Sequence, residues 1–399
     1  MKKIKKRYYV LLSVLLVLII GIVTVNVLFG PLSKKEVHDA IQKELEGVVN
    51  RNDEITSVVL TIYSDKNNIN ETFAVGTTGP DGSEPVTADL SYYTASIGKT
   101  FTSTLIGMLC EEGRISYEDP VSLYLDEQVL DGLFVFDGID YQEQVTIIQL
   151  LQHMSGVGDY FEDPVTQGKT MLEMLQTEQN RMWTPLELLA FTRDNQESVA
   201  RPDDKFHYSD TGYILLGLLI ESVTGQEYHE VLHDRILTPL AMNDTYMLFK
   251  SEPANAQTHP MLEVYIDGVD YSNARSLSMD WTGGGIVSTM SDLLIFQKAL
   301  HDGQLVSLDT LERMTNFDQK YRDGIYYGLG MMKFDFGGFS VFLENMPSIY
   351  GGVGSTSTFM MYDENNDTHI IANYGSLDFM EKSVPSLINI MLLLDRMEE

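Results

Sequence analysis

The sequence predicts an α+β fold, in which a β-sheet built from both ends of the chain lies beside a helical region formed by the middle. Three observations lead to this class. Alternating, β-branched stretches follow residue 50, apolar residues recur at helical spacing through the middle, and strand-like patterns return beyond Gly283. We expect a ligand site where the two ends meet the inserted helices. With 399 residues, 44% of them hydrophobic, the chain can bury a substantial core and is not disordered or collagen-like.

The first segment, residues 1–30, is typical of a membrane anchor. It carries five basic side chains and no acidic one, and residues 10–29 contain no charge. That length spans a bilayer. A cleaved signal peptide would have a shorter apolar stretch and a small-x-small cleavage site, which residues 26–30 do not offer. We therefore predict an uncleaved, single-pass transmembrane helix at the cell membrane, with a cytoplasmic N-terminus and an extracytoplasmic body.

The elements after the anchor follow from local patterns. Residues 31–50 form a predicted juxtamembrane helix, and residues 51–399 form one domain with a helical insertion at roughly 115–280. Alternating, β-branched patterns predict paired strands at 55–63 and 71–75, and strand-like patterns make 339–343, 357–362 and 369–374 further candidate strands. A helix begins at Thr184, where Pro185 takes the first helical position and Glu187 completes a capping box. Further helices are expected at 101–112, 146–154, 211–223, 229–236 and 384–396.

The charge and the cysteine content narrow the possible partners. Lys and Arg number 27 against 58 Asp and Glu, and the net charge is −31. Such a body repels nucleic acid, so we expect no nucleic-acid partner and a small-molecule or peptide substrate that is neutral or cationic. One Cys excludes an internal disulfide and a zinc site built from cysteines.

Ser96 and Lys99 are the first candidates for chemistry. They follow the strand-like Tyr92-Tyr93 and open an apolar helix. A Ser in the first turn of a helix lies near unpaired backbone N–H groups, which stabilise developing negative charge. Lys99 lies on the same helical face, and a desolvated lysine can activate the Ser as a nucleophile. By itself, Ser-x-x-Lys also occurs by chance on surface helices.

Two further segments have both a chemical and a structural interpretation. Tyr208 precedes Ser209 and Asp210 at a predicted helix start, where the Tyr can relay protons or simply be a buried aromatic beside an N-cap. The glycine-rich residues 350–356 precede a strand. Their backbone can hold a substrate or an oxyanion, or can form an ordinary hairpin turn.

His229, Glu230 and His233 fit the H-E-x-x-H pattern of zinc peptidases. Such a site needs a third ligand, for which Glu252 is the nearest candidate by spacing. Pro239 and Pro253 make a supporting second helix unfavourable, so this pattern is the weaker hypothesis.

The order of these motifs resembles that of the class C beta-lactamase-related family of penicillin-binding serine hydrolases. This family includes D-alanyl-D-alanine carboxypeptidases, beta-lactamases, D-amino-acid peptidases and esterases. The segments that carry the resemblance are residues 94–101, 146–156, 208–213, 239–242 and 283–289. The resemblance implies an antiparallel sheet flanked by helices beside an all-helical subdomain, as in the beta-lactamase/transpeptidase-like fold. It also implies acyl transfer through a serine, without a metal or an organic cofactor.

The family pattern gives each candidate a role. Ser96 would be the nucleophile, Lys99 and Tyr208 the proton-transfer pair, and the backbone N–H groups of Ser96 and Val353 the oxyanion hole. The residues expected to bind substrate are Asp210, Tyr350, Gly351 and Gly352.

Two departures from the family pattern bear on the substrate. Tyr350 stands where relatives have a Lys or His that helps bind a carboxylate, and Asp210 stands where many have Asn. An ionised Asp accepts hydrogen bonds but donates none. Paired with Lys99, it would favour the ammonium and shift the general-base role toward Tyr208. An uncharged ester or an amine-bearing substrate suits such a pocket better than a carboxylate.

We therefore predict a membrane-anchored, extracytoplasmic serine hydrolase that forms an acyl-enzyme on Ser96. Its expected substrate is a cell-wall-related D-amino-acid peptide or ester, with lactamase, carboxypeptidase and esterase activities left open. The alternatives are a penicillin-binding-like sensor that binds without turnover and, more remotely, a zinc peptidase.

Overall fold

The computed structural model describes residues 30–79, 81–256 and 259–398, which fall into two units. The predicted anchor at residues 10–29 lies outside the described residues. Within the described ranges, no helix is both long and apolar enough to cross a membrane.

The smaller unit contains residues 30–48 and 384–398. It consists of most of α2 (Lys34–Arg51) and of α14 (Met380–Leu394). The Leu32 amide donates to the Arg396 carbonyl at 2.7 Å, and the Asn389 side chain donates to Glu44 at 3.0 Å. These contacts join the two ends of the described chain. Helices are found at both places where the sequence predicts them.

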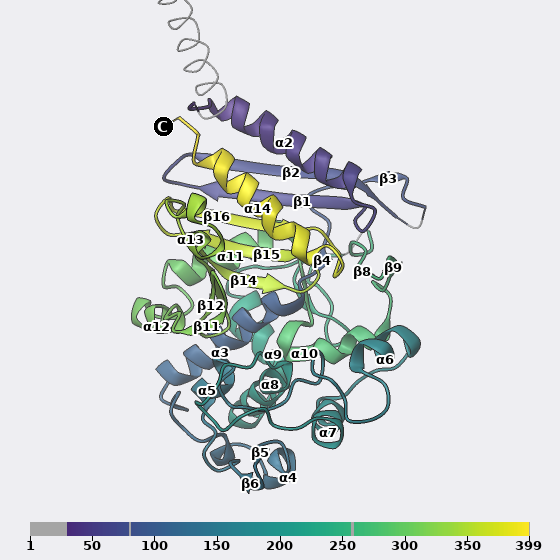
Figure 1. Cartoon of the computed structure of the whole chain (residues 1–399), viewed down its shortest axis with the longest axis vertical. Helices are drawn as coiled ribbons and strands as arrows, with labels where there is room; N and C mark the ends of the chain where they lie inside the picture. Colours follow the sequence, from purple (N-terminus) through teal and green to yellow (C-terminus); the bar gives the residue numbers. More distant parts are fainter. Residues whose placement is uncertain (1–29, 80, 257–258, 399) are drawn as a thin grey trace, which may run out of the picture. The chain divides into compact units, whose positions relative to one another are not determined.

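The larger unit, residues 49–383, is built on a nine-stranded sheet in the order β11-β12-β13-β14-β15-β16-β1-β2-β3 (Figure 1). All neighbouring strands are antiparallel. The strands are β1 (Ser57–Ser64), β2 (Ile69–Thr78), β3 (Glu84–Pro85), β11 (Gln319–Arg322), β12 (Ile325–Tyr327), β13 (Met332–Phe334), β14 (Ile349–Gly354), β15 (Thr358–Asp363) and β16 (Thr368–Asn373). Because β1 pairs with β16, early and late segments share one sheet, as predicted.

The middle of the chain forms the helical region, in the lower half of Figure 1. Helix α3 (Gly98–Glu111) packs against α8 (Asp210–Thr224), α10 (Trp281–Gly284) and β14. The other helices of this unit are α4 (Glu127–Leu130), α5 (Ile147–Leu151), α6 (Met171–Thr177), α7 (Pro185–Asn195), α9 (Tyr228–Leu232), α11 (Met290–His301), α12 (Leu308–Met314) and α13 (Phe336–Phe339). Helix α11 lies against the sheet at β1, β15 and β16. The α+β class is confirmed.

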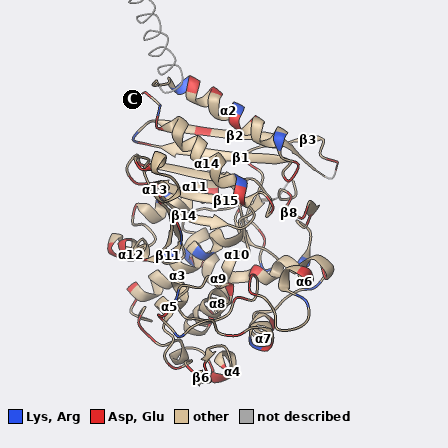
Figure 2. Ribbon diagram, viewed as in Figure 1, with Lys and Arg blue, Asp and Glu red and all other residues tan. Residues whose placement is uncertain are grey.

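Short strands complete this unit. A three-stranded sheet has the order β4-β10-β7, formed by β4 (Tyr92–Tyr93), β10 (Ile286–Ser288) and β7 (Tyr246–Met247). Two hairpins pair β5 (Val135–Phe136) with β6 (Ile139–Asp140), and β8 (Tyr265–Ile266) with β9 (Val269–Asp270). Among the described residues, Lys and Arg positions are scattered over many elements (Figure 2).

The strand predicted at 339–343 is wrong. This segment ends α13 and continues as a 3₁₀ turn, Val341–Leu343. Asp335 and Ser340 accept hydrogen bonds from the backbone N–H groups of Gly337 and Phe342, and these side-chain caps stabilise turns rather than extended backbone. Phe342 is 93% exposed and Val341 is 77% exposed, so the apolar residues of this segment do not mark a buried face.

Candidate active site

Ser96 lies in a 3₁₀ turn, Ala95–Ile97, that leads directly into α3. Ala95 has a φ of +47°, in the left-handed region that L-residues rarely adopt. Such strain is typical of residues that aim a catalytic side chain. Gly98 lets α10 approach, because a Cβ at this position would lie 2.9 Å from the Gly284 Cα. The turn is therefore fixed by α10 on one side and by α3 on the other.

Lys99 is buried directly behind Ser96. Its ammonium donates to Ser96 Oγ at 2.9 Å, to the Gly283 carbonyl at 3.2 Å and to a carboxylate oxygen of Asp210. An ammonium has three protons, so its donor capacity is fully used. Burial alone would lower the pKa of Lys99, but the charge of Asp210, aided by Tyr208 and Asp280, outweighs it and raises that pKa well above its usual value. The group beside Ser96 is thus a charged donor in the resting site.

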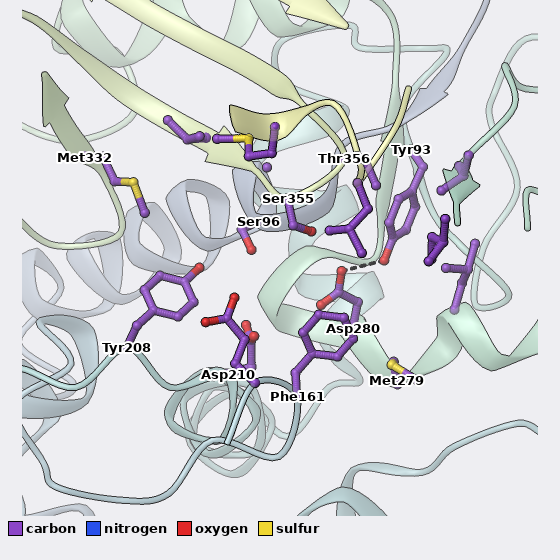
Figure 3. A pocket seen from close by; sticks show the side chains of 18 of the residues that line it. Tyr93, Ser96, Phe161, Tyr208, Asp210, Met279, Asp280, Met332, Ser355 and Thr356 are labelled. Atoms are coloured by element: carbon purple, nitrogen blue, oxygen red, sulfur yellow. Dashed lines mark hydrogen bonds between the residues drawn. The ribbon is translucent and has the colours of Figure 1, made fainter. Parts of the chain in front are cut away.

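Asp210 and Tyr208 are held by the start of α8. The Ser209 amide donates to His153 Nδ1 at 3.0 Å, and the Asp210 amide donates to Asp159 Oδ1 at 2.8 Å. The Tyr208 ring packs on His153 with a centroid separation of 4.2 Å. In Figure 3 the Tyr208 hydroxyl points toward Ser96. These contacts fix the backbone at the start of α8 and the position of the Tyr208 ring beside Ser96.

Tyr208 is neutral in this setting. Burial raises the pKa of Tyr208 well above its usual value, although Lys99 and a hydrogen bond with Ser96 act in the opposite direction. A neutral phenol beside Ser96 can both accept and donate a proton.

Asp280 and Tyr93 are site residues that the sequence reasoning missed. Asp280 ends a 3₁₀ helix, Arg275–Asp280, and accepts a 2.5 Å hydrogen bond from the Tyr93 hydroxyl of β4 (Figure 3). Burial and then the negative charge of Asp210 raise the pKa of Asp280 to about 6, against opposing effects of Lys99 and of the Tyr93 hydrogen bond. No motif in the sequence marks this Asp. Its position four residues before the glycines at 284–285 was the available signal.

The glycines of α10 leave room for the charged groups of Lys99, Asp210 and Asp280 to lie close together. A Cβ on Gly283 would lie 3.2 Å from an Asp210 carboxylate oxygen and 3.4 Å from Lys99 Nζ. A Cβ on Gly284 would lie 2.5 Å from Asp280 Oδ2 and 2.7 Å from the Ala95 carbonyl carbon. Larger residues would therefore separate the carboxylates from Ala95–Ile97, the turn that holds the predicted nucleophile Ser96 (the nucleophile turn).

Ser96 opens into a cavity of about 220 Å³. Tyr208, Asp210 and Asp280 border the same cavity, so the sheet and the helical region both contribute to its wall (Figure 3). Much of the remaining wall is apolar, formed by Phe161, Leu175, Val264, Ile266, Leu277, Met279, Ile325, Met332, Phe334, Leu377 and Met380. Polar groups beside an apolar wall are the usual form of a small-molecule site.

Strand β14 borders the cavity with its C-terminal end, whereas the sequence predicted contact from its earlier residues 350–352. Val353 and Gly354 line the cavity, together with Ser355 and Thr356 just beyond the strand. The predicted role of Val353 in the oxyanion hole stays a prediction, now with its backbone at the cavity.

Tyr350, Gly351 and Gly352 are not among the residues that line this cavity, and their assignment to substrate binding stays a prediction. The Tyr350 ring packs instead with His301, Phe317 and Tyr362, in an aromatic cluster that the sequence spacing did not reveal. Gly352 has a packing role, because a Cβ there would lie 3.2 Å from the Ile97 Cα. Its bare backbone lets β14 approach the nucleophile turn.

The zinc hypothesis is wrong for the described residues, in which no cluster of His, Cys, Asp and Glu could hold a metal ion. The H-E-x-x-H segment is not one continuous α-helix, since α9 ends at Leu232 and a π-helical turn, His233–Leu237, follows. His229 and His233 instead face the carboxylates of Glu227 and Asp234 at 3.5 and 3.2 Å. Neither Glu230 nor Glu252 joins them in a ligand set.

Comparison with known proteins agrees with this geometry. A family model described as Beta-lactamase matches residues 42–375. Penicillin-binding protein 4 of Amycolatopsis lactamdurans is 30% identical over 166 residues, which cover 41% of this chain and 38% of that protein. The chain spans about half or less of the length of the curated relatives it matches first.

Solved structures share the fold over nearly their whole length. A D-stereospecific amidohydrolase from Streptomyces sp. has a TM-score of 0.69 and 28% identity, covering 85% of this chain and 94% of that one. A D-amino acid amidase from Ochrobactrum anthropi SV3 has a TM-score of 0.73 and 21% identity, covering 90% and 98%. Because the family model spans most of the chain and these folds agree, the chain belongs to the beta-lactamase family of serine hydrolases.

Proposed function

We propose that this chain is a serine hydrolase that forms an acyl-enzyme on Ser96, with a cell-wall-related D-amino-acid peptide, amide or ester as its substrate. The observation that carries the proposal is the 2.9 Å hydrogen bond from Lys99 to Ser96 Oγ at the wall of a cavity. The resemblance to a D-stereospecific amidohydrolase supports the choice of a D-amino-acid substrate.

Acylation follows from the positions of three side chains. Ser96 Oγ attacks the substrate carbonyl carbon, and its proton passes to the Tyr208 oxygen. The Tyr208 proton passes in turn to the leaving amine or alcohol, so that the phenol is neutral before and after the step. Lys99 remains an ammonium and stabilises the developing negative charge at Ser96. This relay suits a site in which burial keeps Tyr208 protonated and Asp210 keeps Lys99 charged.

Hydrolysis of the ester on Ser96 repeats the relay in reverse. A water in the place of the leaving group gives a proton to Tyr208 as it attacks the acyl carbon, and Ser96 Oγ receives a proton as it departs. The N–H groups of Ser96 and Val353 are the proposed donors to the oxyanion in both steps.

We also propose an extracytoplasmic location, with residues 10–29 as the anchor. The support is the basic cluster before an uncharged stretch of bilayer length. Cysteine-accessibility labelling on intact cells would test it. A reporter Cys in the body that reacts only after lysis would refute it.

The acyl-enzyme is tested by labelling the purified chain with a fluorophosphonate and mapping the adduct by peptide mass. We expect the adduct on Ser96 and its loss in Ser96→Ala. Ser355→Ala is the matched control, because Ser355 borders the same cavity and has no amine hydrogen-bonded to it among the described residues. Labelling that persists in Ser96→Ala would refute the assignment. Labelling without turnover of any D-alanyl ester or amide would favour the sensor alternative.

A further inference from the structure

Asp280 lines the active-site cavity without an ion pair to either nearby cation, the buried Lys99 or the exposed Arg322. All three protons of Lys99 are used by Ser96, Asp210 and Gly283. Asp280 is left with the Tyr93 hydroxyl as its one hydrogen-bond partner among the described residues, and no Lys or Arg there forms an ion pair with it. Asp280 is half-buried, and a carboxylate withdrawn from water without a cation is costly, so a cationic ligand would remove that cost.

The position of Asp280 limits where such a cation can bind. The Gly284 geometry places Asp280 Oδ2 against the peptide that precedes Ser96, and the carboxylate borders the cavity into which Ser96 opens. Thr356, at the same cavity, is 4% exposed, and its hydroxyl has no hydrogen-bond partner among the described residues. Asp280 and Thr356 thus line the same cavity as Ser96, and Asp280 has hydrogen-bonding capacity that the described residues do not use.

We propose that Asp280, oriented by Tyr93, binds the protonated α-amine of the acyl group that is transferred to Ser96. This inference rests on the proposed function and narrows its substrate class. An α-amine is two bonds from the carbonyl carbon, so it must lie close to the nucleophile turn, as Asp280 does. The apolar residues around the cavity, such as Leu277 and Met279, suit the side chain of the same amino acid.

The direction of cleavage follows from this assignment. The enzyme releases an amine or alcohol from an unblocked amino acid, as an aminopeptidase or amino-acid amidase does. An N-acylated substrate has no charge at this atom, so its binding would cover the half-buried Asp280 and leave it without a cationic partner. Substrates of the carboxypeptidase type, with an acylated nitrogen at this position, are therefore disfavoured.

Two neighbouring carboxylates do not meet the same need. Asp210 is already paired with Lys99. Glu162 borders the cavity from a different segment and has no hydrogen bond to Tyr93. Glu162 therefore provides a matched comparison, because it has the same charge at the same cavity without the placement beside Ala95.

The test compares two substrates on the full-length enzyme. D-phenylalanine 4-nitroanilide carries the amine, and 3-phenylpropionyl 4-nitroanilide lacks it but is otherwise the same. We expect the wild type to prefer the amine-bearing substrate, and Asp280→Asn to reduce kcat/KM for that substrate about 10- to 100-fold, mainly through KM. Activity on the des-amino substrate should change much less. Glu162→Gln should keep most of the preference for the amine-bearing substrate, because Glu162 would act on the amine only through its screened charge and not through a direct contact.

The outcomes separate this inference from the proposed function. Hydrolysis of both substrates at equal rates by the wild type would overturn the amine site while leaving the acyl-enzyme intact. An equal loss of kcat/KM for the amine-bearing substrate in Asp280→Asn and Glu162→Gln would also overturn the amine site, since the effect would then depend only on the total negative charge at the cavity. Fluorophosphonate labelling of Asp280→Asn at the wild-type rate shows that the nucleophile turn is folded. If Asp280→Asn is not labelled, the comparison is repeated with Tyr93→Phe in its place. An unchanged amine preference in Tyr93→Phe would then count against the assignment.

Discussion

The ion pair between Lys99 and Asp210 offers a direct test of the electrostatics on which the mechanism depends. Their side chains are 1% and 6% exposed, so neither charge is solvated by water when its partner is removed. Breaking a buried pair by removing one partner costs about 3–5 kcal/mol of the free energy of unfolding. We expect Lys99→Met and Asp210→Asn each to fall in this range.

The structure further predicts which variant is worse. Lys99→Met leaves Asp210 and Asp280 near each other without the buried ammonium, and like charges raise the cost of burial. Asp210→Asn leaves Lys99 with Ser96, Gly283 and the attraction of Asp280, which lowers the cost. Lys99→Met should therefore lie near the upper end of the range and Asp210→Asn near the lower end.

Urea unfolding of the two single variants and the double variant measures the interaction. The double variant removes both charges, so it should be more stable than the sum of the single changes predicts, with a coupling energy of about 1–3 kcal/mol. Additive effects, or single effects below about 1 kcal/mol, would refute the view that Lys99 is held as an ammonium by Asp210.

Three further predictions concern activity. Asp280 binds an ammonium when ionised, so the preference for amine-bearing substrates should rise as the pH passes about 6 and fall near 8, where the substrate amine loses its proton. Tyr93→Phe removes a hydrogen bond that lowers this pKa, so the lower limb of the pH profile should move upward, and an unmoved limb would contradict the role of Asp280. Tyr208→Phe should slow acylation of Ser96 about 10²- to 10⁴-fold, measured by stopped-flow with a D-amino-acid ester, and a smaller loss would exclude the proton relay. Gly284→Ala should reduce turnover by about 10² while the chain stays folded by circular dichroism, because its Cβ would push the nucleophile turn or Asp280, and unchanged turnover would show that the turn tolerates the shift.

Local patterns predicted the elements whose signals are complete within a few residues. The helix at Pro185–Asn195 forms with Thr184 as its cap and Glu187 in a capping box, as expected. β1, β15 and β16 lie where strand-like sequence patterns placed them, because their short apolar runs are typical of strands buried on both faces, as these strands are. The strands β11 to β14 escaped this reasoning, since β14 is rich in glycine and the others are short.

The candidate site was predicted in part for the same reason. Ser96 and Lys99 are one helical turn apart, so their spacing alone implies that they meet, and the resemblance added Tyr208 and Asp210. The aromatic packing of Tyr350 was not predicted, because a residue count along a strand does not show which neighbour its ring packs against.

The sequence by itself determined the class of the fold, the pairing of Ser96 with Lys99 and the acidic character of the chain, since each depends on composition or on contacts within a turn. Only the tertiary structure decided that Asp280 and Tyr93 belong to the site. They lie 187 residues apart in the chain, and their hydrogen bond exists because β4 and the segment before α10 are packed around the same cavity. Charge balance in a buried pocket depends on which side chains the fold brings together, and no local pattern carries that information.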